Sequence, residues 1–264
     1  ISVYLSSTVT LPKRTSPESY YGVFDYCSNL KTVYTEQVLP YMFSSQSWNY
    51  SLFPYCSNIE TIIVGEGVQS IPSQFCFRCY NLKSITIPST ITSFGSSAFK
   101  ECTSLETINI PSGVTTIGGE CFYGCTSLKS INIPASVIQL GYTVGNDGDC
   151  FRNCSNVESI TVDPENTIYT DGGGKNCIVK RSNNSLIVGC KNTQLYEGIV
   201  SIQQYAFENI TDLESINIPA SLTTIANEGQ PFTNCNLKTI TVNQANPIYT
   251  DGGTLGCKNC IVRS

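Results

Sequence analysis

Apolar residues recur along this chain with a period of 23 residues. Leu82, Leu105 and Leu128 each open the pattern Leu-x-x-Ile-x-Ile, in which the last two apolar residues alternate with polar ones. Alternation with a period of two is typical of a short strand with one buried face. A proline such as Pro111 or Pro134 then follows and ends the strand. The pattern therefore predicts one short strand in every repeat.

The second half of each repeat carries further apolar positions without a clear period. Val114 and Ile117 follow the proline, and then a small residue precedes a phenylalanine, as in Cys121-Phe122. We expect irregular turns or a short helical turn here. One such coil cannot cover its own apolar residues, whereas stacked coils bury them together. The period thus predicts a mainly β repeat solenoid in which equivalent positions form vertical files.

Aligning the first apolar position of each repeat gives about nine coils over residues 22–264, a repeat domain. These positions are Leu30, Ile59, Leu82, Leu105, Leu128, Val157, Cys190, Leu213 and Leu237. Residues 1–21 lie outside the pattern, and we expect a cap or a remnant of a preceding segment. Two longer coils predict loops within 42–52 and 142–147. A third predicts a β-hairpin insertion near 163–189, and residues 243–264 repeat its first part as an incomplete second insertion.

The residue after each aligned position alternates in charge through the whole array. It reads Lys31, Glu60, Lys83, Glu106, Lys129, Glu158, Lys191, Glu214 and Lys238. If the coils stack in register, each charge lies roughly 5 Å, one strand spacing, from opposite charges. Exposed pairs of this kind stabilise by about 0–1 kcal/mol each. We therefore interpret the ladder as a structural device that fixes the register of the coils.

The outward positions of the predicted strands are short, polar and uncharged over most of the array. Asn109, Asn132 and Asn217 occupy the position that Tyr34 holds in an earlier coil. We predict these four side chains as possible ligand contacts.

Aromatic residues gather towards the N-terminal end of the array. They include Tyr20, Tyr21, Tyr26, Tyr34, Tyr41, Trp48, Tyr50 and Tyr55. Trp and Tyr anchor many binding sites, so Trp48 and Tyr50 are further candidate contacts. The alternative is that these residues cap the first coils.

Fourteen cysteines are the most conspicuous chemical feature. Cys79, Cys102, Cys125 and Cys154 share one slot of the repeat, and we interpret them as small buried thiols with a structural role. One alternative is a disulfide, Cys121–Cys150 or Cys125–Cys154, in an oxidising compartment. The other is metal binding at the CxxC motifs 76–79 and 257–260, which are too many coils apart to share an ion. We expect neither a metal site nor a cofactor.

Charge and composition narrow the classes of function. A net charge of −5 and a pI of about 4.8 offer no basic field, which argues against nucleic acid as a partner. No apolar run approaches the roughly 18 residues that insert into a membrane. The absence of histidine removes the usual catalytic triads and the zinc sites that depend on histidine. No pair of acids is placed together away from lysines, so we expect no catalytic residues and no enzyme.

One family resembles this sequence closely. The string Leu-x-x-Ile-x-Ile-Pro-x-x-(Val/Ile)-x-x-(Ile/Phe)-Gly-x-x-Ala-Phe-x-x-Cys is similar to the 23-residue repeat of BspA-like, or Treponema pallidum-type, leucine-rich repeat proteins. Residues 79–134 carry it most strictly, and segments 166–169, 176–179 and 186–193 resemble a hairpin insertion of that family. The resemblance implies a right-handed leucine-rich-repeat superhelix with a parallel sheet on its concave face.

The resemblance also implies a function. BspA-like proteins are typically surface or secreted proteins of host-associated bacteria and some mucosal protists, with roles in adhesion or protein–protein recognition. We expect an extracellular or cell-surface recognition scaffold that binds a host or neighbouring-cell macromolecule, preferably a protein. The alternatives are a structural spacer of a larger surface protein and a glycan-binding module. We also expect the native protein to continue beyond this chain, or its C-terminal edge to associate end to end with a neighbour.

Overall fold

The computed structural model describes residues 2–5, 24, 27, 29–36, 53, 56–141, 148–226, 231–250 and 262–263. The regular structure of these residues consists of short β-strands and one 3-10 helix, Asp149–Phe151. The mainly β character predicted from the repeat is therefore confirmed. The chain divides into two compact units, unit 1 (1–128 and 136–151) and unit 2 (129–135 and 152–264).

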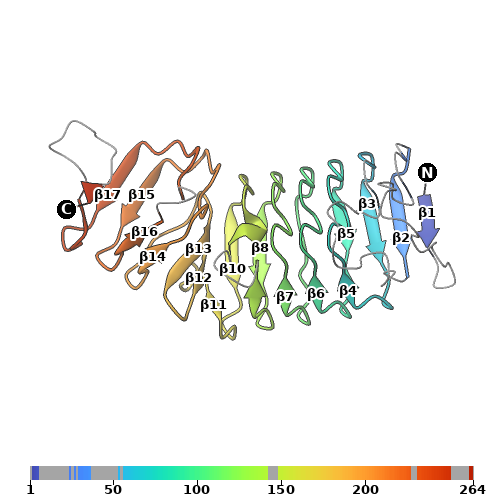
Figure 1. The fold of residues 1–264 in the computed structure, drawn as a ribbon, viewed down its shortest axis with the longest axis horizontal. Coiled ribbons are helices and arrows are strands. Elements are labelled where there is room, and N and C mark those ends of the chain that lie inside the picture. The colour runs from blue at the N-terminus through green and yellow to red at the C-terminus, as the bar shows by residue number, and fades with distance from the viewer. Residues whose placement is uncertain are drawn as a thin grey trace, which may run out of the picture. The chain divides into compact units, whose positions relative to one another are not determined.

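Two parallel sheets form the framework of unit 1, and their strands follow one another coil by coil (Figure 1). The first sheet contains β1 (Ser2–Leu5), β2 (Thr32–Thr35), β3 (Thr61–Val64) and β5 (Ser84–Thr86), in that order. The second contains β4 (Ser70–Ile71), β6 (Ser93–Phe94), β7 (Thr116–Ile117) and β9 (Gln139–Leu140). The coils that contain β3 and β5 thus contribute to both sheets, through β4 and β6 respectively.

The first sheet pairs equivalent repeat positions. Val33 lies opposite Ile62, and Ile62 lies opposite Ile85. Val33 and Ile62 are completely buried, whereas Tyr34 between the buried Val33 and Thr35 is exposed. The predicted strand with one buried face is therefore present. Strand β1 also pairs with β2, so residues before position 22, where we saw no repeat, already contribute a strand.

One coil of unit 1 does not join the first sheet. Residues 106–110 form no strand, although Ile108 and Ile110 are buried as the pattern predicts. The prediction of a strand in every repeat is wrong at this coil, which is held by the packing of its two isoleucines instead of by ladder hydrogen bonds.

The turns beyond the second sheet form a third ladder of hydrogen bonds, which the sequence pattern did not indicate. Alternate N–H groups of one coil donate to carbonyls of the next, as in Gln74 to Ser96 (2.9 Å), Cys76 to Ala98 (2.7 Å) and Arg78 to Lys100 (2.8 Å). Two positions per coil have positive φ here, for example Ser97 (57°) and Glu101 (62°). Asn153, Asn209 and Asn234 share the position of Glu101 in their coils, in keeping with the tolerance of Asn for this conformation.

Unit 2 contains parallel strand pairs from its coils and a larger sheet that includes the predicted hairpin. The pairs are β8 (Ser130–Ile133) with β10 (Ser159–Val162) and β15 (Ser215–Ile218) with β17 (Thr239–Val242). The larger sheet has the order β11 (Tyr169–Thr170), β12 (Cys177–Lys180), β13 (Ser185–Gly189), β14 (Ser201–Ile202), β16 (Thr224–Ile225). Near the C-terminus, β18 (Tyr249–Thr250) pairs with β19 (Val262–Arg263).

The predicted hairpin is confirmed, and it forms part of a sheet of the framework. Strands β12 and β13 are antiparallel, and β13 pairs in parallel with β14, so the insertion widens a sheet of the framework. Every residue of β13 is buried. Apolar side chains such as Ile187 and Val188 explain this burial, because they gain more from joining the core than from facing water.

The insertion also closes the edge of the β8–β10 pair. The side-chain oxygen of Asn176 accepts a hydrogen bond from the N–H of Ile160 at 3.2 Å, and the carboxylate of Asp171 accepts one from Val162 at 3.4 Å. An uncovered strand edge can pair with other chains. Side chains of the hairpin therefore occupy the backbone donors that another strand would use.

The same turn occurs at the start of both insertions. The Asn166 side chain accepts hydrogen bonds from the N–H groups of Ile168 (2.9 Å) and Tyr169 (2.7 Å) and donates to Pro134. Asn246 makes the same contacts with Ile248, Tyr249 and Pro219. The register of β18 with β19, Tyr249 opposite Arg263, likewise matches that of β11 with β12, Tyr169 opposite Lys180.

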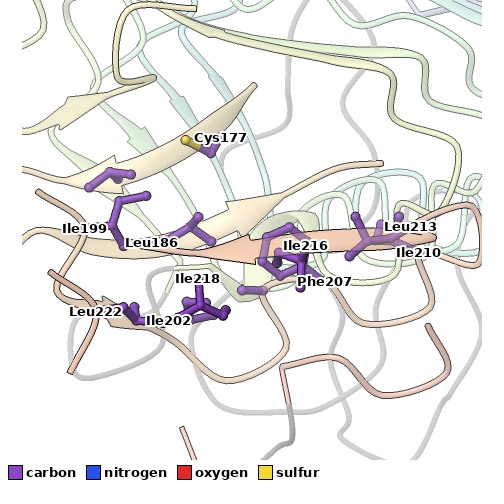
Figure 2. Close-up of a cluster of buried hydrophobic side chains, with 12 residues drawn as sticks. Cys177, Leu186, Ile199, Ile202, Phe207, Ile210, Leu213, Ile216, Ile218 and Leu222 are labelled. Atoms are coloured by element: carbon purple, nitrogen blue, oxygen red, sulfur yellow. The ribbon is translucent and has the colours of Figure 1, made fainter. Parts of the chain in front are cut away.

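Files of aliphatic and aromatic side chains fill each unit. In unit 1, Phe99 stacks on Phe122, and Phe122 on Phe151, with centroids 5.3 Å apart in both pairs. In unit 2, Figure 2 shows Phe207, Ile210, Leu213 and Ile216 in one buried cluster. The distances match ordinary aromatic packing, so the coil spacing is set by the core.

Candidate recognition surface

The exposed face of the strand sheets is the most regular surface of the molecule, and we call it the strand face. In unit 1, its central file reads Tyr4, Tyr34, Ile63 and Thr86, which lie opposite one another in register. The alternation of each strand places these side chains outside and the neighbouring aliphatic residues inside. The sheet thus holds one row of side chains at fixed spacing.

Two tyrosines form the N-terminal end of this file, and we call Tyr4 and Tyr34 the tyrosine platform. Their ring centroids are 6.2 Å apart and the ring planes are inclined by 40°. Tyr4 is 60% exposed and Tyr34 36% exposed. The hydroxyl of Tyr4 donates a hydrogen bond to the carboxylate of Glu36, and this bond together with the negative charge of Glu36 raises the pKa of Tyr4. The platform is therefore an exposed aromatic surface with a carboxylate at its rim.

In unit 2, the strand face consists of amide and hydroxyl groups. The hydroxyl of Thr161 donates to Asn132 Oδ1 at 2.7 Å, and the hydroxyl of Thr241 donates to Asn217 Oδ1 at 3.0 Å. Both asparagines are exposed on strands β8 and β15. Neighbouring coils thus fix the orientation of the predicted contact residues Asn132 and Asn217.

The other three predicted contact residues, Asn109, Trp48 and Tyr50, do not lie on described strands of the strand face. Asn109 is exposed in unit 1 but belongs to the coil without a strand. Trp48 and Tyr50 lie outside the described residues, as do the expected loops 42–52 and 142–147. Tyr4 is a residue that the sequence reasoning missed. The signal available was its place in the apolar–polar alternation Val3-Tyr4-Leu5, which matches Val33-Tyr34-Thr35.

The charge ladder lies along one border of the strand face. Glu60 receives Lys31 Nζ at 3.0 Å and Lys83 Nζ at 3.1 Å, and these two hydrogen bonds lower the pKa of its carboxyl group. In unit 2, Lys191 pairs with Glu158 at 3.0 Å, and Lys238 pairs with Glu214.

The ladder is interrupted at other steps. Within the described residues, no ion pair joins Lys83 to Glu106, Lys129 to Glu158 or Lys191 to Glu214. Lys191 instead approaches Asp212 at 3.8 Å. These steps therefore lack a direct ion pair, and the spacing of about 5 Å between their opposite charges stays a prediction. The hydrogen bond from Lys191, and to a lesser extent the positive charge of Lys129, lower the pKa of the Glu158 carboxyl group. At Glu106, the physical reason for the missing ion pair is that residues 106–110 lack the ladder hydrogen bonds that would align the side chain with Lys83.

The cysteines of the shared slot are buried, and several make a specific hydrogen bond. The Cys102 thiol donates to the carbonyl of Cys76 at 3.1 Å, and the Cys125 thiol donates to that of Phe99 at 3.2 Å. Cys56 and Cys235 make the equivalent bond. The same carbonyls accept the N–H that closes their own turn, so the next coil's thiol uses the second lone pair. Cys79 and Cys154 are also buried.

These thiols are protected from reaction. The twelve cysteines of the described residues carry thiol groups, and neither Cys121–Cys150 nor Cys125–Cys154 forms a disulfide in this structure. Burial raises the pKa of the Cys76 and Cys102 thiols well above the ordinary range, and that of Cys177 to about 12. The thiolate is the reactive form of cysteine, so the structure favours a packing role. Cys257 and Cys260 lie outside the described residues.

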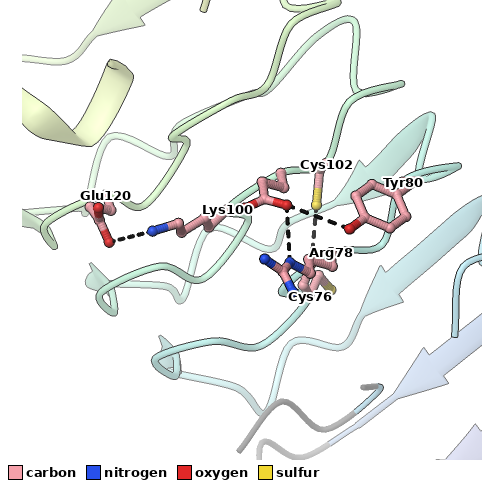
Figure 3. A network of polar contacts seen from close by, with 7 residues as sticks. Cys76, Arg78, Tyr80, Lys100, Cys102 and Glu120 are labelled. Atoms are coloured by element: carbon pink, nitrogen blue, oxygen red, sulfur yellow. Dashed lines mark hydrogen bonds and ion pairs between the residues drawn. The ribbon is translucent and has the colours of Figure 1, made fainter. Parts of the chain in front are cut away.

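A second polar surface of unit 1 is formed by the turns of successive coils (Figure 3). Arg78 Nε donates to Glu101 at 3.0 Å, and the Tyr80 hydroxyl lies 3.5 Å from the same carboxylate oxygen. Lys100 pairs with Glu120 at 2.7 Å. Charges here neutralise one another, so this surface offers a ligand less than the strand face does.

Among the described residues, no group of three or more cysteines, aspartates and glutamates is arranged to hold a metal ion. Nor does any helix there have the length and apolar character needed to cross a membrane.

Stacked coils of one repeat, parallel sheets and a buried leucine file define the class of leucine-rich repeat proteins. The model of the BspA-type leucine-rich repeat region matches residues 20–158, 74–185 and 184–260, with six copies of the repeat, and the chain belongs to this family. A comparison with curated proteins gives no significant match.

Solved structures of similar fold are bacterial. A leucine-rich cell-surface protein of Faecalibacterium prausnitzii A2-165 is 21% identical with a TM-score of 0.57, over 92% of this chain and 69% of that one. A leucine-rich repeat protein of Bacteroides ovatus is 22% identical with a TM-score of 0.54, over 92% and 63%. The pneumococcal vaccine antigen PcpA is 14% identical with a TM-score of 0.53, over 92% and 55%. At these identities the likeness shows the fold alone.

Proposed function

We propose that this chain is a non-enzymatic recognition scaffold at the cell surface that binds a protein ligand through its strand face. The observation that carries the proposal is the strand face itself, on which parallel sheets hold exposed Tyr, Asn and Thr side chains in register. Rigid presentation reduces the entropy that is lost on binding. The exposed tyrosines at one end are of the residue type that anchors protein interfaces.

Two further observations support the location and the class. The family is one of leucine-rich repeats, and a structural relative is a cell-surface protein. The chain contains no histidine, and the described carboxylates Glu60, Glu158 and Glu214 are engaged with lysines of neighbouring coils. A paired, exposed carboxylate is poorly suited to acid–base catalysis.

The test is a screen of the purified chain on extracellular protein and glycan arrays, followed by variants of the strand face. We expect binding to at least one protein, and a loss of that binding in the strand-face variant of the unit that makes the contact, Tyr34→Ala for unit 1 or Asn217→Ala for unit 2. The control is Thr92→Ala, Thr115→Ala, which changes exposed residues beside the second sheet of unit 1. Equal loss in the strand-face variant and the control, or no protein ligand at all, would contradict the proposal. Binding to glycans alone would favour the glycan-binding alternative. No binding on either array would favour the structural spacer.

The C-terminal edge offers a separate prediction. Strand β17 is the last strand of its pair, and Ile240 and Val242 within it and Leu237 before it are only partly buried. End-to-end association through this edge stays a prediction, which sedimentation at increasing concentration would test.

A further inference from the structure

The tyrosine platform combines three features on one face of β1 and β2. Tyr4 and Tyr34 lie directly opposite each other in the sheet register. Glu36 follows Tyr34 by two residues, so it continues the same face, and its carboxylate accepts the Tyr4 hydroxyl. Two exposed aromatic rings and a carboxylate are therefore held together by backbone pairing and by a side-chain hydrogen bond.

Among the described residues, the charged side chains that follow β2 and β3 are acidic, Glu36 and Glu66. Glu66 follows β3 by two residues, is exposed, and is the only charged residue between Val64 and Phe77. Lys31 and Lys83 lie at the opposite ends of β2 and β5 and share Glu60. The aromatic rings add to this field, because the face of an aromatic ring carries partial negative charge.

The chain itself shows three times what such a group binds, twice with arginine and once with lysine. Arg152 lies over the ring of Tyr205, with its guanidinium carbon 3.6 Å from the ring centroid, and donates to both carboxylate oxygens of Glu208. Arg78 lies 4.8 Å over the ring of Phe77 while it donates to Glu101. In both places an aromatic ring and a glutamate hold one guanidinium group between them. Lys100 Nζ lies 4.7 Å from the centroid of the Tyr123 ring and pairs with Glu120 at 2.7 Å.

We propose that the tyrosine platform and Glu36 bind a basic side chain of the protein ligand, arginine in preference to lysine; the inference rests on the proposed function. A planar guanidinium group stacks on a tyrosine ring and forms forked hydrogen bonds with a carboxylate at the same time, whereas an ammonium group is a compact and strongly hydrated charge. A neutral sugar would stack on the rings but would gain nothing from the charge of Glu36.

The experiment titrates the full chain, labelled with ¹⁵N, with the peptide Gly-Arg-Gly-Arg-Gly and with matched peptides that carry citrulline or lysine instead of arginine. We expect millimolar binding that shifts the amide signals of β1 and β2. The arginine peptide should bind at least fivefold tighter than the citrulline peptide and about twofold tighter than the lysine peptide. Raising the ionic strength from 20 to 300 mM should weaken it at least threefold.

Variants assign the site. Tyr34→Ala and Glu36→Gln should each weaken binding of the arginine peptide at least threefold, whereas Tyr34→Phe should retain it. Tyr80→Ala is the matched control, because Tyr80 is 40% exposed beside Glu101, which already holds Arg78. It should bind as the unchanged chain does, and thermal melts should show that each variant folds.

Three results would overturn the inference. They are equal binding of the arginine and citrulline peptides, arginine binding unaffected by Tyr34→Ala and Glu36→Gln, and binding of a neutral oligosaccharide such as chitotriose at the platform in place of the peptide. If the peptides fail while the strand-face variant still loses a protein ligand found on the arrays, this inference is wrong and the proposed function stands.

Discussion

Gly118 lies where the backbone of one coil passes close to the preceding coil, and its replacement tests the stacking directly. A Cβ atom at Gly118 would lie 2.5 Å from Ser96 N and 2.7 Å from the carbonyl carbon of Gly95. Ordinary contact begins near 3.4 Å, so the coils would have to separate locally by 3.4 − 2.5 = 0.9 Å. The hydrogen bond from Gly118 N–H to Phe94 C=O, at 2.8 Å, and the stacked Phe99 and Phe122 resist this movement.

The cost of Gly118→Ala follows from these terms. Overpacking costs about 1–3 kcal/mol and weakening one hydrogen bond about 0.5–1.5 kcal/mol, while alanine lowers the entropy of the unfolded chain by an equivalent of about 0.4–1 kcal/mol. We expect a net loss of about 0.5–4 kcal/mol, or an apparent Tm lower by about 1–16 °C for a chain of this size.

Calorimetry or circular dichroism melts would measure the loss, with Gly113→Ala as the control. Gly113 is exposed, and a Cβ there would lie 3.3 Å from the carbonyl oxygen of Ile91. The control should change stability by less than about 0.5 kcal/mol. Equal stability of Gly118→Ala and the unchanged chain would refute the close stacking of the coils.

Two further predictions concern ionisable groups of unit 2. Burial raises the pKa of the Cys177 thiol from 9.0 to about 12, so the folded state holds this proton more tightly than the unfolded state does. The resulting stabilisation is complete below pH 9. It is lost as the pH rises towards 12, by up to about 1.4 kcal/mol per pH unit. Urea unfolding between pH 8 and 11 should show this decline, and Cys177→Ala should reduce its slope; an unchanged slope would contradict the assignment. Glu208→Gln should lower the free energy of unfolding by about 1–3 kcal/mol, because the carboxylate is 11% exposed and holds Arg152, whereas Glu214→Gln, at 62% exposure, should cost less than about 0.5 kcal/mol. Similar losses in the two variants would show that burial does not strengthen the Arg152 pair.

The sequence predicts those parts of the fold in which a period is long enough to be read. Four residues of alternation, as in Ser130–Ile133, are enough to predict a strand. The hairpin is predicted by two apolar runs on either side of Asn183-Asn184. The second sheet escapes prediction because its strands, such as Thr116–Ile117, are two residues long and carry no period. The ladder of hydrogen bonds between the turns cannot be predicted from the sequence, because backbone hydrogen bonds place almost no constraint on side-chain type.

The candidate site follows the same rule. Tyr34, Asn132 and Asn217 can be assigned to an exposed file because their coils obey the repeat. Tyr4 is missed because its strand precedes the first recognised coil and its partnership with Glu36 joins residues 32 apart in the sequence. The interruption of the charge ladder at Glu106 depends on the loss of a few backbone hydrogen bonds, which the regular sequence of that coil conceals.

The one-way direction of the turn ladder has a consequence for how such chains change length. Where the 23-residue spacing is kept, a coil receives N–H groups from its predecessor and offers its own to its successor at the same positions, as Ser97 and Glu101 do with Gly119 and Tyr123. Loss or duplication of one 23-residue segment would therefore bring together two coils whose hydrogen-bond donors and acceptors already match, so few backbone groups at the new junction would be left unpaired. Recombination of whole repeats would therefore change the length of the array and leave its fold unchanged.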